Sequence, residues 1–232
     1  MAMDHWDVAS ALDQVQARIR QAEALSNFHS VDGVTLIAVS KKKSAALIRQ
    51  AALAGQRDFG ESYVQEALEK MDQLSDLALT WHFIGPIQTN KVKLIARAFD
   101  WVHSVDRLKI AQKLNDQRPD NRVPLNICLQ VNISSESTKS GISRDLLPDL
   151  LESVIQLPHL KLRGLMAIPS RNQDQDSQRQ AFRQLARMQD SMAQQFNYPL
   201  DVLSMGMSGD LEAAIAEGAT MVRIGTAIFG HR

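Results

Sequence analysis

One alternation runs through most of the chain. Short apolar runs rich in strand-forming residues are each followed by a longer segment or loop, most with helical periodicity. Eight such runs cover 35–40, 57–60, 79–84, 101–103, 125–131, 161–166, 201–203 and 221–224. The helical patterns cover 44–54, 62–74, 88–98, 106–117, 143–156, 176–195 and 208–217. Strands that alternate with helices pair in parallel, so this pattern predicts a single (β/α)8 barrel of the TIM type.

A doubly wound open sheet is the alternative architecture. Such sheets usually have fewer strands, and their dinucleotide-binding forms open with Gly-x-Gly-x-x-Gly after the first strand, a motif this chain lacks. We therefore expect one barrel domain over 1–232, with residues 1–30 forming an extra N-terminal helix that packs on it. The apolar residues at helical spacing in that segment are Val8, Leu12, Val15, Ile19 and Ala22.

Individual residues mark the expected ends of several helices. Gly55 and Gly218 stand where C-terminal caps are expected, and Asp106 and Ser208 stand where N-terminal caps are expected. The polar stretch 170–180 is expected to be a loop.

Charge and composition exclude several classes of function. Lys plus Arg and Asp plus Glu both number 26, so the formal net charge is zero and no nucleic-acid or membrane surface is expected. No apolar run approaches the ~18 residues of a membrane span, and the N-terminus lacks a signal-peptide pattern. The single cysteine, Cys128, is expected to be buried. A chain without a possible internal disulfide suits a reducing compartment, so we expect a cytoplasmic protein.

Two loops of the expected barrel could bind an anion. Barrel sites lie at the carboxyl ends of the strands, and the loops after strands seven and eight commonly bind phosphate. In "SMGMSGD", Ser208 and Gly209 precede a helix; in "RIGTA", Gly225 and Thr226 offer backbone N–H groups and a hydroxyl. Each loop alone could be an ordinary helix cap, but two at adjacent strand ends indicate a phosphate cradle.

Two basic residues could supply chemistry beside this cradle. Lys41 in "LIAVSKKKS" falls at the carboxyl end of the first strand, whereas Lys42 and Lys43 are expected to be solvated. Arg223 in "MVRI" could point into the barrel or outwards to a helix acid. Partial burial near a second cation would lower the pKa of Lys41, and a neutral amine can form a Schiff base. Together these features suggest a pyridoxal 5′-phosphate (PLP) site.

The spacing of the six histidines does not indicate a metal site. They show no His-x-x-x-His or His-Glu-x-x-His spacing, so no metal is expected. His82 and His103 fall in expected strands and are interpreted as structural or site-lining residues.

Several separated segments resemble one family in the same order along the chain. They are "AVSK", "FGESYVQEA", "WHFIGPIQTNK", "VHSVDR", "STKSGI", "RGLMAIP" and "LSMGMSGDLEAAIAEGATMVRIGTAIFG". From about residue 35 to the C-terminus, the chain resembles the YggS/PROSC group of PLP homeostasis proteins. The resemblance implies a single barrel like the N-terminal domain of alanine racemase, with PLP bound as a Schiff base to Lys41.

The resemblance also implies roles for other residues. Ser208, Gly225 and Thr226 would contact the phosphate. Arg223 would contact the pyridine nitrogen, and Met166 would line the cofactor.

Two candidate cofactor-binding positions depart from the family pattern. Ser62 stands where the family usually has asparagine, and Gly209 stands where it often has aspartate. The shorter Ser62 side chain is expected to lose a contact near the cofactor, and Gly209 is expected to loosen the phosphate loop.

Three functions follow from these features. An arginine at the pyridine nitrogen makes PLP a weaker electron sink, and the chain has no residues left for the second domain of a racemase. We therefore expect a monomeric PLP carrier or regulator of PLP and amino-acid homeostasis, without its own turnover, that serves PLP-dependent apo-enzymes. The alternatives are a PLP-dependent racemase or lyase, and an aldolase-type barrel that binds a sugar phosphate without PLP.

Overall fold

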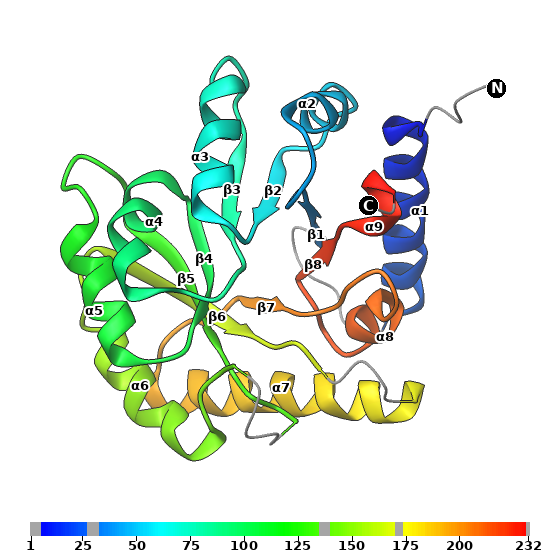
Figure 1. The fold of residues 1–232 in the computed structure, drawn as a ribbon. Helices are drawn as coiled ribbons and strands as arrows, with labels where there is room; N and C mark the ends of the chain where they lie inside the picture. The colour runs from blue at the N-terminus through cyan, green and yellow to red at the C-terminus, as the bar shows by residue number, and fades with distance from the viewer. Residues whose placement is uncertain (1–5, 27–32, 135–139, 170–173, 231–232) are drawn as a thin grey trace.

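The computed structural model describes residues 6–26, 33–134, 140–169 and 174–230. Within these ranges, eight parallel strands close into a barrel in sequence order (Figure 1). They are β1 (Thr35–Val39), β2 (Asp58–Glu61), β3 (Thr80–Phe83), β4 (Trp101–Val105), β5 (Leu125–Gln130), β6 (Leu160–Met166), β7 (Val202–Ser204) and β8 (Met221–Ile224). The predicted (β/α)8 barrel is confirmed, and the open sheet is wrong because β8 pairs with β1.

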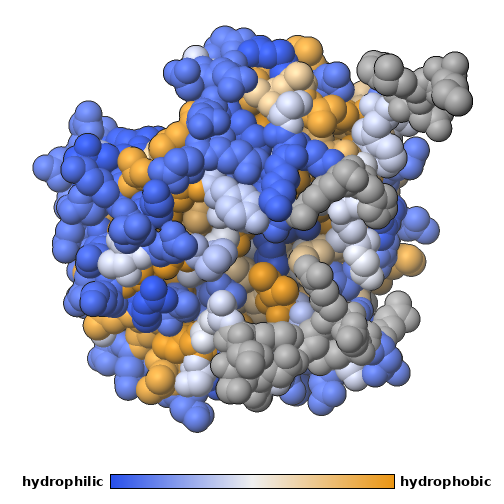
Figure 2. Space-filling view, in the orientation of Figure 1, coloured by the Kyte–Doolittle hydropathy of each residue, from blue (hydrophilic) through white to orange (hydrophobic). Residues whose placement is uncertain are grey.

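Helices surround the strands (Figure 1). They are α1 (Val8–Leu25), α2 (Ala45–Leu53), α3 (Val64–Gln73), α4 (Val92–Ala98), α5 (Leu108–Gln117), α6 (Leu147–Val154), α7 (Gln175–Phe196), α8 (Leu211–Ala216) and α9 (Thr226–Phe229), with 3₁₀ turns η1 (Thr89–Lys91) and η2 (Arg144–Leu146). Hydrophilic side chains cover much of the face seen in Figure 2, with apolar patches between them. No helix among the described residues is long and apolar enough to cross a membrane.

Alternation along the strands divides the core into two parts. Val102 and Ile127 belong to the large cluster that includes residues of the outer helices. Their neighbours Trp101 and Cys128 point the other way and belong to a smaller cluster with Met166. Strands buried on both faces are expected when helices cover a parallel sheet. The inner face therefore carries both apolar filling and the polar groups described below.

The two C-terminal glycines are confirmed, and the two N-terminal caps are wrong. Gly55 (φ +101°) and Gly218 (φ +94°) each directly follow the residue that caps a helix. Helix α5 is capped by Arg107, whose Nη1 binds the Asp106 carboxylate at 2.6 Å. Helix α8 is capped by Asp210 rather than Ser208.

Two segments expected as loops contain helix. Residues 170–173 lie outside the described residues, but α7 begins at Gln175, after the N-terminal cap Asp174, so the loop expected as far as 180 is too long and the helical pattern over 176–195 is confirmed. The Asp174 carboxylate accepts the Ser177 N–H at 2.9 Å. The segment after β8 also differs, because Thr226–Phe229 form the single turn α9.

The N-terminal helix packs beside the last elements of the barrel (Figure 1). The Trp6 indole N–H donates to the Ile228 carbonyl at 2.7 Å, and Arg18 pairs with Glu212 at 2.8 Å. Apolar residues of α1 are buried in the large core cluster. The N-terminal helix therefore braces the elements that follow β7 and β8.

Candidate functional site

The predicted site residues lie at or just beyond the carboxyl ends of the strands. Lys41 follows β1, Ser62 follows β2, Met166 ends β6, Ser208 and Gly209 precede α8, Arg223 lies in β8, and Gly225 and Thr226 follow β8. In a closed parallel barrel these ends share one face. The structure thus places the predicted residues at the carboxyl-terminal end of the barrel.

A cleft of about 580 Å³ opens at this end. Lys41 and Ser62 line it together with residues that the sequence did not single out, namely Tyr63, Gly85, Pro86 and Ile168. Its size falls in the usual range of small-molecule pockets, roughly 300–1,000 Å³. Of the predicted residues, only Lys41 and Ser62 line this cleft.

A buried polar cluster holds the backbone just before Lys41. Ser40 Oγ donates to Glu61 Oε1 at 2.7 Å, and Lys70 Nζ donates to the same oxygen at 2.7 Å. Lys70 also donates to the Ser40 carbonyl at 2.8 Å. Burial raises the pKa of Glu61, although the hydrogen bonds from Lys70 and Ser40 act in the opposite direction. We call these three residues the Ser40–Glu61–Lys70 cluster.

The three consecutive lysines have different surroundings. Lys41 is half-buried, and Lys42 is exposed, with left-handed backbone (φ 62°). Lys43 Nζ donates to the carbonyls of Phe229 and Gly230, each at 2.9 Å. The expectation of two solvated lysines is therefore right for Lys42 and wrong for Lys43, whose ammonium binds carbonyls at the end of α9.

The two glycine-containing loops differ in how closely they are packed. A Cβ added to Gly225 would lie 3.1 Å from the Val39 carbonyl oxygen, so this turn lies against the end of β1. A Cβ on Gly209 would meet nothing within 4 Å. The loop before α8 is closed by the Asp210 carboxylate, which accepts the Met207 N–H at 2.5 Å.

Arg223 points into the barrel, so the inward hypothesis is confirmed and the outward pairing with a helix acid is wrong. Its Nη1 donates to Ser204 Oγ at 2.7 Å, and its Nη2 donates to the Ala167 carbonyl at 3.0 Å. Burial lowers the pKa of Arg223 to about 10, and the charge of Asp210 opposes that shift. Arg223 therefore remains a cation at neutral pH, and a guanidinium can only donate hydrogen bonds.

Two other predicted residues lie within the barrel wall. Met166 is fully buried and belongs to the inner cluster with Cys128. Burial raises the pKa of the Cys128 thiol to about 12, so this cysteine is an inert packing residue, as expected.

The interior also holds polar residues whose connection the sequence did not reveal. His82 and His103 are fully buried and hydrogen-bonded to each other at 2.9 Å. Asp58 and Ser204 bind their outer ring nitrogens at 2.9 Å and 2.8 Å. Strand alternation could have placed all four residues on the inner face, but not their partners.

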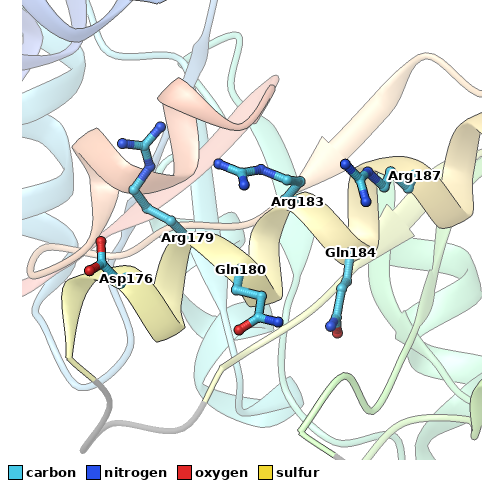
Figure 3. A pocket seen from close by; sticks show the side chains of 6 residues that line it. All are labelled: Asp176, Arg179, Gln180, Arg183, Gln184 and Arg187. Atoms are coloured by element: carbon cyan, nitrogen blue, oxygen red, sulfur yellow. The ribbon is translucent and has the colours of Figure 1, made fainter.

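A separate hollow of about 430 Å³ lies on the outside of the barrel along α7. Figure 3 shows its lining side chains, Asp176, Arg179, Gln180, Arg183, Gln184 and Arg187, projecting from that helix. Two of the arginines pair with Glu217, each at 2.8 Å. The hollow is thus distinct from the strand-end site. In the part of the chain that the structure describes, no group of three or more His, Cys, Asp or Glu could hold a metal.

Comparisons with known proteins relate the chain to one family. The family described as alanine racemase, N-terminal domain, matches residues 11–232. The chain is 56% identical over 225 residues to the pyridoxal phosphate homeostasis protein of Pseudomonas aeruginosa, covering 97% of this chain and 96% of that protein. It is 50% identical over 229 residues to the protein of the same name from Escherichia coli K12, covering 97% of each.

Solved structures show the same relationship. PipY of Synechococcus elongatus PCC7942, solved with PLP bound, superposes with a TM-score of 0.86 at 37% identity, covering 96% of this chain and 100% of PipY. Alanine racemase from Corynebacterium glutamicum shares the fold, with a TM-score of 0.68 at 18% identity, covering 97% of this chain and 60% of that one. The chain therefore belongs to the pyridoxal phosphate homeostasis proteins, a group built on the alanine racemase N-terminal domain.

Proposed function

We propose that this protein binds PLP as a Schiff base on Lys41 and acts in PLP and amino-acid homeostasis as a carrier or regulator without turnover of its own. The observation that carries the proposal is the half-buried Lys41 in a 580 Å³ cleft, at the barrel end to which β8 delivers Arg223. The PLP-bound structure of PipY supports the choice of ligand.

The residues at this end of the barrel fit PLP by their chemistry. The cofactor supplies an aldehyde that condenses with a primary amine and a ring that accepts electrons when its nitrogen is protonated. Lys41 offers the amine, and Ser208, Gly225 and Thr226 offer hydroxyl and backbone donors for the phosphate. The turn at Gly225 lies against the end of β1, two residues before Lys41.

The presence of Arg223 favours a carrier function over an enzymatic one. A guanidinium donates hydrogen bonds and cannot accept them, so it suits an unprotonated pyridine nitrogen. With that nitrogen unprotonated, the ring withdraws electrons weakly, which disfavours racemisation and decarboxylation. Met166 and Ser62 would complete the cofactor surroundings, and the open position of Gly209 leaves room beside the phosphate loop.

The proposal extends to the setting of the protein. We propose that the chain forms one PLP-binding barrel against which the N-terminal helix packs. We also propose that the protein is a monomer and lies in the cytoplasm. The lone buried cysteine suits a reducing compartment. PLP-dependent apo-enzymes are the proposed recipients.

Absorbance spectroscopy tests the cofactor part of the proposal. After loading with PLP and removal of free PLP by gel filtration, the protein should stay yellow, Lys41→Ala should lack the Schiff-base absorbance, and the control Lys42→Ala should behave as the parent because Lys42 is exposed. A parent protein that stays colourless would contradict the proposal and favour a sugar-phosphate barrel.

Incubation of the PLP-loaded protein with amino acids tests the carrier role. We expect no sustained racemisation or decarboxylation, together with activation of an added PLP-dependent apo-enzyme. Steady turnover that depends on Lys41 would instead make the protein an enzyme.

A further inference from the structure

A chain of hydrogen bonds runs through the barrel interior and ends at Arg223. Asp58 Oδ1 lies 2.9 Å from His82 Nε2, and His82 Nδ1 lies 2.9 Å from His103 Nε2. His103 Nδ1 lies 2.8 Å from Ser204 Oγ, which lies 2.7 Å from Arg223 Nη1. We call these five residues the interior relay.

The interior relay joins walls of the barrel that are not neighbours. Asp58 begins β2, and His82 and His103 lie on β3 and β4, so the first links follow adjacent strands. The next link joins His103 on β4 to Ser204 on β7. These two strands are separated by β5 and β6 in the barrel (Figure 1). The chain therefore connects the amino end of the barrel, where Asp58 is part-exposed, with the buried Arg223 near the site.

The donor at one end favours one direction for every bond. Arg223 can only donate, so Ser204 accepts from it, and the single O–H of Ser204 is satisfied when it donates to His103 Nδ1. A neutral His103 then carries its proton on Nε2 and donates to His82 Nδ1. His82 in turn carries its proton on Nε2, where the Asp58 carboxylate accepts it.

The acceptor at the other end demands the same direction. An ionised carboxylate accepts only, so Asp58 independently requires the proton of His82 on Nε2. The ring of His82 also stacks on Trp101, with centroids 5.5 Å apart and planes 13° apart, which restrains its rotation. All contacts of the relay are therefore satisfied by one arrangement of protons, with opposite charges at its two ends.

We propose that Asp58, His82, His103 and Ser204 are positioning residues that fix the guanidinium of Arg223 toward the pyridine nitrogen of bound PLP. The inference rests on the proposed function. In this inference, the interior relay helps to keep the pyridine nitrogen of PLP unprotonated, although the relay extends to the far end of the barrel. Loss of the Ser204 hydroxyl would leave both Arg223 Nη1 and His103 Nδ1 without this partner and free the guanidinium to turn.

Nitrogen-15 NMR of histidine-labelled protein without PLP tests the relay itself. His82 and His103 should both show the neutral form with the proton on Nε2, assigned through His82→Gln and His103→Gln. Because Asp58 requires this direction and the Ser204 O–H favours it, Asp58→Asn and Ser204→Ala should each keep these tautomers, whereas the double variant should show averaging. A proton on Nδ1 of either ring in the parent protein would overturn the inference.

Spectroscopy with PLP tests the link to the cofactor. Ser204→Ala should move the wavelength of the Schiff-base band and weaken PLP binding about tenfold, as expected when a hydrogen bond to a charged group is lost. Asp58→Asn should move the band in the same direction by less. Asp100→Asn is the matched control, since Asp100 lies at the same end of the barrel with a similarly part-exposed side chain but outside the relay, and it should change neither property.

The outcomes separate the two proposals. A parent protein that forms no band contradicts the proposed function, and the inference about PLP falls with it. A normal parent band that Ser204→Ala leaves unchanged in wavelength and affinity overturns the inference alone.

Discussion

At the scale of residues, the setting of Lys41 depends on a neighbour that the sequence did not suggest. Lys70 is buried and donates to Glu61, to the Ser40 carbonyl and to Glu66. Glu61 itself is fully buried and has one oxygen, Oε2, without a hydrogen-bond partner. The Lys70–Glu61 ion pair therefore holds the end of β1 through the Ser40 carbonyl. Loss of the Lys70 charge would leave Glu61 buried without a partner of opposite charge.

Replacing Lys70 with methionine should therefore destabilise the fold strongly. Removal of one partner of a buried ion pair typically lowers the free energy of unfolding by about 3–5 kcal/mol. Urea denaturation measures this change. Lys113→Met, on the exposed face of α5, is the control and should change the free energy by less than about 0.5 kcal/mol. A Lys70→Met loss as small as that of the control would show that the cluster does not hold β1.

The buried His103 should make the fold sensitive to acid. Burial first, and then the charge of Arg223 and the charge that His82 would carry when protonated, lower its pKa well below the ordinary value of 6.5. Below pH 6.5 the unfolded chain binds a proton that the folded chain does not, so stability falls as pH decreases, by at most about 1.4 kcal/mol per pH unit.

Unfolding measured between pH 7 and 5 checks this expectation. His103→Gln should flatten the dependence, although it lowers stability at every pH. His159→Gln, a change at the surface, should keep the parent slope. An unaltered slope in His103→Gln would mean that another group titrates.

At the scale of elements, strands were more predictable than caps and short helices. The run 221–224 matches β8 at both ends, because alternation and burial on both faces leave a clear apolar signal. Helix α9 was missed because four residues are too few to show a helical period. The caps at α5 and α8 were misplaced because Arg107 and Asp210, where these helices begin, make no side-chain hydrogen bond to the first turn, so residue type gave no signal of the helix start.

The same contrast holds for the site. Strand parity and position predicted that Lys41 would lie at the barrel mouth and that Arg223 could point inward. Strand parity and position could not predict the hydrogen bond between Ser204 and His103, because β4 and β7 face each other only across the closed barrel. Partners that depend on closure are absent from any local pattern.

The loop before α8 offers a matched pair of glycine substitutions. Gly206 has φ +93°, and an added Cβ would lie 2.7 Å from the Ala214 Cβ, whereas Gly209 has open space around it. Gly206→Ala should lower the free energy of unfolding by about 1–3 kcal/mol, and Gly209→Ala by less than about 0.5 kcal/mol. Thermal denaturation compares them, and equal effects would contradict the loop geometry.

At the scale of the whole molecule, one architecture accounts for both the site and its support. Closure of the barrel places the candidate PLP-binding residues at the carboxyl ends of the strands, while the interior relay runs from Arg223 to Asp58 at the other end. Helix α1 packs beside α8 and α9, the two helices that follow the proposed phosphate loops. The relatives named for PLP homeostasis match almost the whole chain in sequence, so the family assignment covers the barrel and the N-terminal helix together.

Lys41 is the proposed attachment point of PLP, and borohydride reduction followed by peptide mass spectrometry identifies the lysine that carries the cofactor. Reduction should fix one PLP per chain on the peptide that contains Lys41, with fragment ions assigning it to that lysine. Lys42→Ala should give the same result, and Lys41→Ala should give no labelled peptide. Stoichiometric labelling of Lys43, of Lys91 in the same cleft or of any other lysine, with Lys41 unlabelled, would exclude Lys41 as the attachment point.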